Sequence, residues 1–278
     1  MTVQRLARAT LPVTTTNWEV GMRRGTRATA AAVAAIGMLA AAGPATAADR
    51  SARTRVVAVE GVAKGNAERR VEVLVVVPAG ASARAAGDKA LAGQGAKRVR
   101  PKPEPPQSQS YTFTGLRWDR LPVVQYYNGA GQRVAGARTA LTNTYGDWSN
   151  VSGSLFRISS GGLTTRCPSL VRECPGAQRN DSRNDVGWAQ LSNNTLGVTW
   201  STSGIDEADM AINTRFAWST GCVARPNTFD LESVYLHENG HVAGLGHSSD
   251  VRAVMYPSYQ TARCALAQDD KNGIAALY

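Results

Sequence analysis

All three histidines of the chain lie in one eleven-residue window, at spacings typical of metal ligands. The window reads HENGHVAGLGH, so that His237, Glu238 and His241 form the pattern H-E-x-x-H and His247 completes H-E-x-x-H-x-x-G-x-x-H. Residues four apart share one face of a helix, so His237 and His241 can present ring nitrogens to a single Zn²⁺ while Glu238 projects toward a bound water. Three nitrogen ligands leave a fourth position open, which is typical of a catalytic zinc site.

The residues around the motif are those that an active-site helix needs. The short H-E-x-x-H pattern arises by chance in roughly one chain in a hundred of this length, but the extended pattern is far rarer. Gly244 is placed to end the helix in a left-handed conformation, which turns the chain so that His247 can reach the metal. Asp230 or Thr228 could cap the start of the helix. Apolar residues on both sides of the motif would bury it: Phe229, Leu231, Val234, Tyr235, Leu236, Val242 and Leu245.

A second motif follows eight residues after His247, where Met255 stands in the segment AVMYPSY. Together with the histidine pattern, this segment resembles the Met-turn of the metzincins. The chain is similar in particular to the matrixins, the matrix metalloproteinase family. The similarity rests on the glycines within the motif, on Ser248, on the strand-like segment 208–212 and on the terminal D-D-x-x-G-I-x-x-L-Y at 269–278. Dense matches span about 70 residues, and residues 111–200 match only loosely.

The resemblance implies a zinc endopeptidase that acts on protein or peptide substrates. Such a zinc lowers the pKa of its water to about 7 and polarises the scissile carbonyl, while Glu238 takes the proton of the water and delivers it to the leaving amine. Met255 would form an apolar floor beneath the ligands. Pro257 and Tyr259 would belong to the wall of the pocket for the substrate side chain that follows the cleaved bond.

The resemblance also implies the fold and several supporting residues. The expected class is α/β (α+β), a metzincin zincin fold with a twisted mixed sheet, an active-site helix, a second long helix that includes Thr139–Asn150, and a small C-terminal subdomain below the zinc cleft. Leu196–Trp200 is the candidate edge strand for antiparallel pairing with the substrate, with a buried strand as the alternative. Asp270 would hydrogen-bond the Met-turn and Asp269 could hold a processed N-terminal ammonium, with capping of the last helix as the competing role.

The chain departs from the family pattern in several places. It has no further histidines for a second, structural zinc, so one catalytic Zn²⁺ is expected. No cysteine precedes Cys167, so latency cannot use a leader thiol. Asp206, Glu207 and Asp209 are close enough to contribute to a Ca²⁺ site, with a solvated acidic loop as the alternative. Asn239 replaces the usual apolar residue of the motif, which would alter packing without removing any chemistry.

The four cysteines form an even set, which in an exported chain predicts two disulfides. Of the three pairings we favour Cys167 with Cys174 and Cys222 with Cys264. The second bridge would tie the segment before the active-site helix to the segment after the Met-turn. Zinc binding by these cysteines is the alternative, but their spacings are not C-x-x-C.

The first part of the chain differs in composition from the rest. Residues 1–110 contain 17 Lys plus Arg and 7 Asp plus Glu, whereas residues 111–278 contain 14 of each. A basic start, an apolar run at 28–42 and an Ala-Thr-Ala sequence predict a signal peptide over 1–47, with Met22 as an alternative start. Residues 48–97 read as a propeptide or small N-terminal segment, 98–110 as a basic, proline-rich linker and 111–278 as the protease domain.

The predicted propeptide has little material for a core of its own. It contains two apolar runs, Val56–Val59 and Val71–Val77, followed by an Ala/Gly-rich segment that could be helical, and it has no aromatic residue or cysteine. Together with the linker, residues 48–110 are about 60 residues of this kind and make only a marginal core, so the segment is a small dependent domain or a processed leader.

These observations define the partners and the competing functions. The neutral protease domain argues against a nucleic-acid partner, because a binder should keep its positive charge on the folded part. The apolar run at 28–42 is shorter than the roughly 18 to 20 residues that cross a bilayer, so we expect no stable membrane anchor and a secreted, extracellular monomer. The alternative function is a catalytically inactive metal-binding or adhesion module on the same fold; the intact Glu238 argues against it.

Overall fold

The computed structural model describes residues 54–64, 68–99, 109–168, 181–202 and 206–278. All of them belong to one of the two units into which the chain divides, Ala45–Tyr278. The predicted signal peptide, Cys174 and most of the predicted linker lie outside the described residues.

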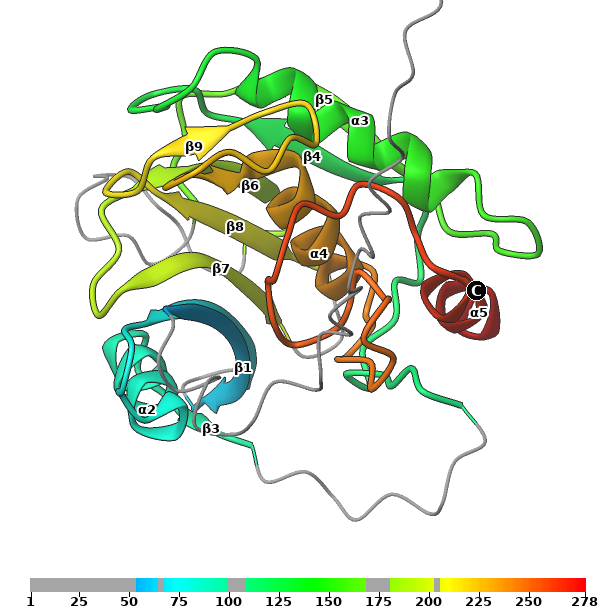
Figure 1. Ribbon diagram of the computed structural model, residues 1–278. Helices are drawn as coiled ribbons and strands as arrows, with labels where there is room; N and C mark the ends of the chain where they lie inside the picture. Colours follow the sequence, from blue (N-terminus) through cyan, green and yellow to red (C-terminus); the bar gives the residue numbers. More distant parts are fainter. Residues whose placement is uncertain (1–53, 65–67, 100–108, 169–180, 203–205) are drawn as a thin grey trace, which may run out of the picture. The chain divides into compact units, whose positions relative to one another are not determined.

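The centre of the described part is a mixed, eight-stranded sheet (Figure 1). Its strand order is β3-β1-β2-β7-β8-β6-β4-β5. Neighbouring strands are parallel in the part of the sheet made of β8, β6, β4 and β5. Strand β7 pairs antiparallel with both β8 and β2. The strand bounds are β1 Arg55–Ala63, β2 Arg69–Val77, β3 Ala96–Arg98, β4 Val123–Tyr127, β5 Ile158–Leu163, β6 Asn184–Ala189, β7 Thr195–Thr202 and β8 Ala208–Asn213. A separate parallel pair joins β9 Trp218–Ser219 to β10 Phe229–Asp230.

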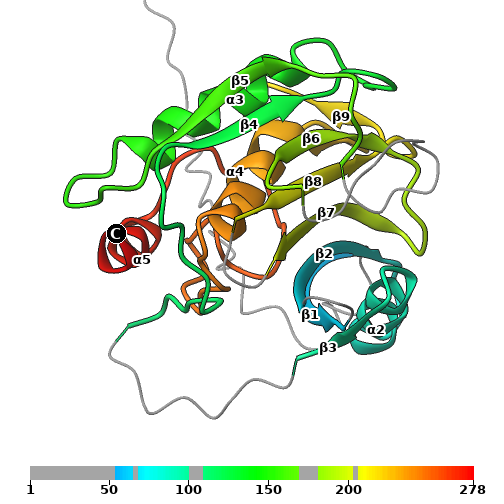
Figure 2. The ribbon, with the colours of Figure 1, turned by 180° about the vertical axis from the view of Figure 1, so that it is seen from behind.

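Two helices cover one face of the sheet: α3 Ala137–Ser149, which contains most of the predicted helix Thr139–Asn150, and α4 Leu231–Val242 (Figures 1 and 2). Trp148 Nε1 donates a hydrogen bond to Leu236 O at 2.9 Å. Asn239 Nδ2 donates to Thr144 Oγ1 at 2.8 Å, so the unusual polar residue of the motif joins the same two helices. With α5 Gln268–Leu277 at the C-terminus, this arrangement confirms the predicted α/β class with two long helices on a mixed sheet.

The predicted propeptide contributes three strands to this sheet. Its two apolar runs form β1 and β2, and the Ala/Gly-rich segment forms α2 Ala83–Gly93, whose start is capped by Ser82 Oγ. Alternate residues of β2 point to opposite faces. Val71, Val73, Val75 and Val77 enter a core shared with Leu91, Val198 and Trp200, whereas Leu74 enters the core that contains α3 and α4. The segment is therefore a dependent unit whose core is completed by the strands of the C-terminal part.

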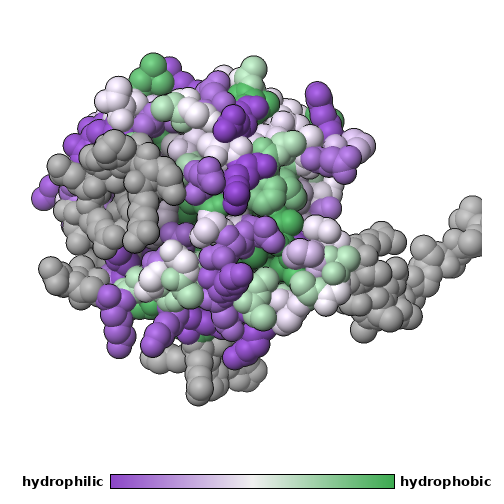
Figure 3. Space-filling view, turned by 90° about the vertical axis from the view of Figure 1, so that its left-hand side faces the viewer, coloured by the Kyte–Doolittle hydropathy of each residue, from purple (hydrophilic) through white to green (hydrophobic). Residues whose placement is uncertain are grey.

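The surface of the described residues carries few large apolar side chains, namely Phe113, Leu155, Leu163, Val223 and Val251. On the side seen in Figure 3, hydrophilic residues are interspersed with apolar ones. Among the described helices, none combines the length and the hydropathy that crossing a bilayer requires.

The disulfide Cys222–Cys264 joins the loop before α4 to the loop after the Met-turn, as predicted, with a Cα–Cα distance of 5.8 Å. Cys167 is buried, and because Cys174 lies outside the described residues its pairing with Cys167 stays a prediction.

Replacing both Cys222 and Cys264 by serine should lower the free energy of unfolding by about 2–4 kcal/mol, because the bridge closes a loop of 42 residues in the unfolded chain. Thermal unfolding followed by circular dichroism would measure the change. The matched control is Ser249→Ala, a change at an exposed serine away from the bridge. A double variant as stable as the wild type would contradict the prediction.

Candidate active site

Helix α4 carries the histidine motif because its sequence provides both a start and an end. Asp230 is the N-cap, and its Oδ1 accepts the Ser233 N–H at 2.9 Å. Gly244 adopts φ +97°, and a Cβ there would lie 2.3 Å from Leu116 O, so only glycine fits the turn that follows the helix. That turn brings His247 back to the helix: its ring centroid lies 5.5 Å from that of His237 and 4.8 Å from that of His241.

The two helix histidines each have one ring nitrogen held by the backbone. His237 Nδ1 lies 2.7 Å from Val254 O, and His241 Nδ1 lies 2.9 Å from Leu245 O. When Nδ1–H donates to a carbonyl oxygen, Nε2 carries no proton and its lone pair can bind a metal. The two Nε2 atoms are 3.2 Å apart. Burial lowers the pKa of His237 to about 4 and lowers the pKa of His241 well below its ordinary value. Both rings are therefore neutral, the form that binds metal.

Glu238 projects from the same helix and is completely buried. Its Oε2 accepts a hydrogen bond from Thr199 Oγ1 of β7, and its Oε1 has no hydrogen-bond partner among the described residues. Burial raises the pKa of Glu238 to about 7, although the Thr199 hydroxyl acts in the opposite direction. The structure thus brings the four motif residues together at one buried place.

The Met-turn lies directly against the helix. A Cβ on Gly240 would lie 2.2 Å from Met255 Sδ, so the absence of a side chain on the helix makes room for the methionine. Asp270 accepts hydrogen bonds from Val254 N at 2.8 Å and Met255 N at 3.1 Å, which confirms the contact expected of it. It also accepts from Ala267 N, so it caps α5 at the same time. Asp269 accepts a hydrogen bond from Ser248 Oγ at 2.6 Å.

The predicted pocket wall stands beside His237. Tyr259 and Ser258 line a small cavity together with Val234, His237, Val254 and Leu74. The Tyr259 hydroxyl accepts the Asp230 N–H at 2.9 Å, which ties the wall to the start of α4. Pro257 O accepts a hydrogen bond from Ala58 N of β1 at 3.2 Å. The candidate edge strand Leu196–Trp200 lies within β7, and in the intact chain both of its edges are paired and all its residues are buried.

Two acidic residues of the N-terminal segment 54–99, called the leader below, enter the site, and sequence reasoning missed both. One ligand atom each of Glu72, His237, His241 and His247 can be chosen so that all four lie within 4.8 Å of one another. Glu60 Oε1 lies 3.1 Å from His247 Nδ1, and Glu72 Oε1 lies 3.9 Å from His247 Nε2. Burial and the nearby Glu238 carboxylate raise the pKa of Glu72 well above its ordinary value. The available signal was a single carboxylate inside the apolar run Val71–Val77.

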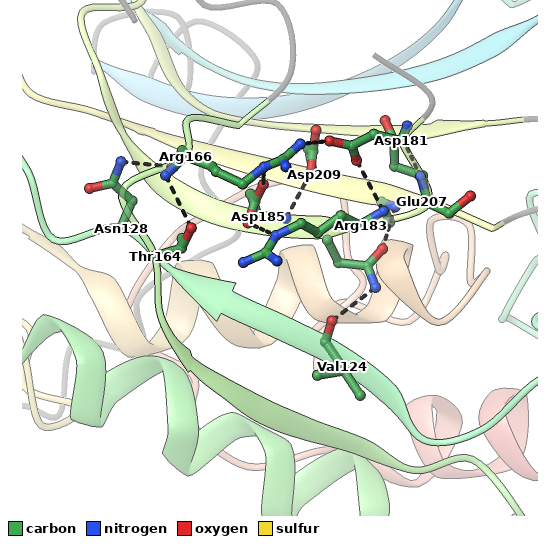
Figure 4. A network of polar contacts seen from close by, with 12 residues as sticks. Val124, Asn128, Thr164, Arg166, Asp181, Arg183, Asp185, Glu207 and Asp209 are labelled. Carbon is green, nitrogen blue, oxygen red and sulfur yellow. Dashed lines mark hydrogen bonds and ion pairs between the residues drawn. The ribbon is translucent and has the colours of Figure 1, made fainter. Parts of the chain in front are cut away.

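The acidic segment considered for calcium is tied to its surroundings by nitrogen donors (Figure 4). Glu207 accepts the Ser182 N–H at 3.1 Å and lies 3.4 Å from Arg69 Nη2, while Asp209 accepts the Asp185 N–H at 2.8 Å. Arg166 and Arg183 reach Asp185 at 3.5 and 3.1 Å. Glu207 and Asp209 are buried, so they do not belong to a solvated loop, and the calcium site stays a prediction.

A sequence model of the matrixin family matches residues 179–278, the part of the chain that holds β6–β10, α4, α5 and the histidine cluster. The C-terminal part of the chain is matrixin-like. This matrixin-like chain is similar to metalloendoproteinase 1 of Glycine max, with 61% identity over 54 residues, 19% of the chain and 18% of that relative. It is also similar to interstitial collagenase of Oryctolagus cuniculus, with 33% identity over 148 residues, 52% of the chain and 28% of the relative. A shorter match to neutrophil collagenase of Homo sapiens has 49% identity over 53 residues, 18% of the chain and 11% of the relative.

The matrixin-like chain spans less than a third of the length of these relatives.

Helix α4 and the Met-turn approach each other most closely where Gly240 faces Met255. Gly240→Ala should destabilise the protein by roughly 1–3 kcal/mol, because the new Cβ would overlap Met255 Sδ and displace the turn. Gly146→Ala in α3 should instead stabilise it by about 0.4–1 kcal/mol, because a Cβ there meets only Asn150 Nδ2 at 3.6 Å and alanine favours a helix. Denaturant unfolding measures both changes; equal signs would refute the assigned packing.

Proposed function

We propose that the protein is a secreted zinc endopeptidase that hydrolyses peptide bonds in proteins or peptides. The observation that carries this proposal is the convergence of three imidazoles on one point with a buried carboxylate beside them. The match of residues 179–278 to the matrixin family supports the same activity. An export route is supported by the signal layout at 22–47 and by the disulfide.

The residues present fit a zinc ion. His247 Nε2 is buried and has no hydrogen-bond partner among the described residues, and the Nε2 atoms of His237 and His241 approach each other at 3.2 Å. Lone pairs brought together inside a protein repel unless a cation or a proton lies between them. We therefore assign His237, His241 and His247 as the three protein ligands of one catalytic zinc. When bound, that zinc polarises the scissile carbonyl and lowers the pKa of a water molecule.

Glu238 is the group that moves protons in this proposal. It lies next to His237 on α4, and the Thr199 hydroxyl fixes one of its oxygens while the other stays unpartnered. The unpartnered Oε1 would accept the proton of the attacking water and then deliver it to the leaving amine, which makes one residue both general base and general acid. Thr199 acts as a positioning residue, because it holds the carboxylate without touching the substrate.

The substrate would bind between β7 and the segment Pro257–Tyr259. Once residues 54–99 are removed, strand β7 would offer a backbone edge for antiparallel pairing. Tyr259 with Val234 and Val254 lines a pocket beside His237. Met255 is buried beneath the cluster, where it would form the apolar floor. We propose a monomeric, extracellular enzyme with no nucleic-acid partner, since the part after residue 110 has no net charge.

Glu238→Gln should reduce peptide hydrolysis by about 10³-fold or more, because the amide cannot accept the proton of the attacking water. The test uses the full chain after trypsin cleavage of the basic linker 98–110, with a peptide library and mass spectrometry as the readout. Glu232→Gln, six residues earlier on the same helix and outside the cluster, is the matched control and should keep full activity. Chelator-insensitive cleavage or an active Glu238→Gln variant would refute the mechanism.

The purified full chain should contain about one zinc, because the three histidines make one site. Mass spectrometry of the metals in acid-digested protein measures the content. His241→Ala should lower it to well below one zinc per chain, whereas Glu232→Gln should leave it unchanged. A content near two would show that further ligands exist.

A further inference from the structure

The leader strand β2 occupies the edge of β7 at which a substrate would bind. It pairs antiparallel with β7 from Arg69, opposite Thr202, to Val75, opposite Thr195, and Figure 2 shows the two strands side by side. The other edge of β7 pairs with β8, so the intact chain leaves no free backbone on this strand over the paired length. An added antiparallel strand is how a peptide binds to a sheet edge. The leader thus follows the course expected of a bound substrate.

The register of this pairing places Glu72 at the metal cluster. Glu72 lies directly opposite Thr199, the residue whose hydroxyl holds Glu238. The side chain of Glu72 is 4% exposed, and neither of its carboxylate oxygens has a hydrogen-bond partner among the described residues. A buried carboxylate without donors is costly unless it binds a cation or takes up a proton, as beside the Glu238 carboxyl group here. Among the described residues, the group of metal-binding side chains that includes Glu72 is the histidine cluster.

A second leader residue supports the same arrangement. Glu60 of β1 lies opposite Glu72 of β2, where two like charges repel unless something lies between or beside them. Here the two carboxylates face different nitrogens of His247. Glu60 Oε1 is 3.1 Å from His247 Nδ1, and Glu72 Oε1 is 3.9 Å from His247 Nε2. A carboxylate on Nδ1 is the usual outer partner of a zinc-binding histidine and directs Nε2 toward the metal.

The leader also fills the neighbouring pocket. Leu74 lies two residues beyond Glu72 on the same face of β2 and lines the cavity formed with Val234, His237 and Tyr259. Only 3% of Leu74 is exposed. Strand β1 covers the wall itself, because Ser258 Oγ donates to Val56 O at 3.0 Å and Ala58 N donates to Pro257 O.

We propose that Glu72 is the fourth protein ligand of the zinc in the intact chain, with Leu74 in the pocket for a substrate side chain, so that residues 54–99 keep the site closed. This inference rests on the proposed function. The carboxylate takes the position that the attacking water needs, which explains how a strand on a substrate's course avoids being cut. Cleavage within 98–110 makes the leader a separate molecule, whose occupancy then falls with dilution.

The test measures the metal site directly in the intact, cobalt-substituted full chain. Visible absorption reports the ligands of Co²⁺, and acetohydroxamate, a small zinc-chelating probe, reports whether the fourth position is open. Glu72→Ala should change the spectrum and bind acetohydroxamate at least about tenfold more tightly than the wild type, because the site is then no longer closed most of the time. Glu68→Gln, at an exposed carboxylate just before β2, is the matched control and should behave as the wild type.

Glu72→Gln is the second variant, since it keeps the size of the side chain and should open the site without loss of fold. Mass spectrometry confirms that each chain is intact before the measurement. A spectrum and probe affinity in both Glu72 variants equal to those of the wild type would overturn the proposal. If both Glu72 variants match the wild type but the chain binds the metal and cleaves peptides after removal of the leader, only the role of Glu72 is refuted. Absence of metal and of cleavage would refute the proposed function itself.

Discussion

The site depends on keeping three imidazoles neutral and close together inside the protein. Burial of a histidine disfavours its charged form and so lowers its pKa, and the neighbouring histidines of this cluster lower the pKa further. The cluster can therefore bind a cation, because each neutral ring keeps a single proton and leaves its other nitrogen free to bind. Because the rings approach within 4.8 to 5.5 Å of one another, their positions must be fixed by other parts of the fold.

These positions are fixed by a chain of contacts that begins far from the metal cluster. Asp270 of α5 holds the backbone N–H groups of Val254 and Met255, and Val254 O in turn holds the ring of His237. Trp148 of α3 donates to Leu236 O and so anchors α4 from its other side. The C-terminal helix therefore contributes to the geometry of the site without touching it, and a change at Asp270 would be felt at His237.

The sequence predicts the parts of the site that depend on short spacings. His237, Glu238 and His241 are brought together by one turn of helix, and Gly244 provides the turn that adds His247. The mixed sheet and its two long helices also follow from the resemblance carried by these motifs. Glu72 was not predictable in the same way, because its place depends on the register between β2 and β7, strands more than a hundred residues apart. A lone carboxylate in an apolar run indicates that something unusual is buried, but it does not say against what.

The position of β7 between two partners has a consequence for the protein in solution. In the intact chain this strand is an interior strand, and Val198 and Trp200 are covered by the valines of β2 and by Leu91. Loss of the leader turns it into an edge with a row of unpaired N–H and C=O groups next to newly uncovered apolar side chains. Such an edge binds extended peptides, and it also invites pairing with the same edge of another molecule and hence aggregation. By pairing with β7, residues 54–99 would keep the folded chain from associating through this edge.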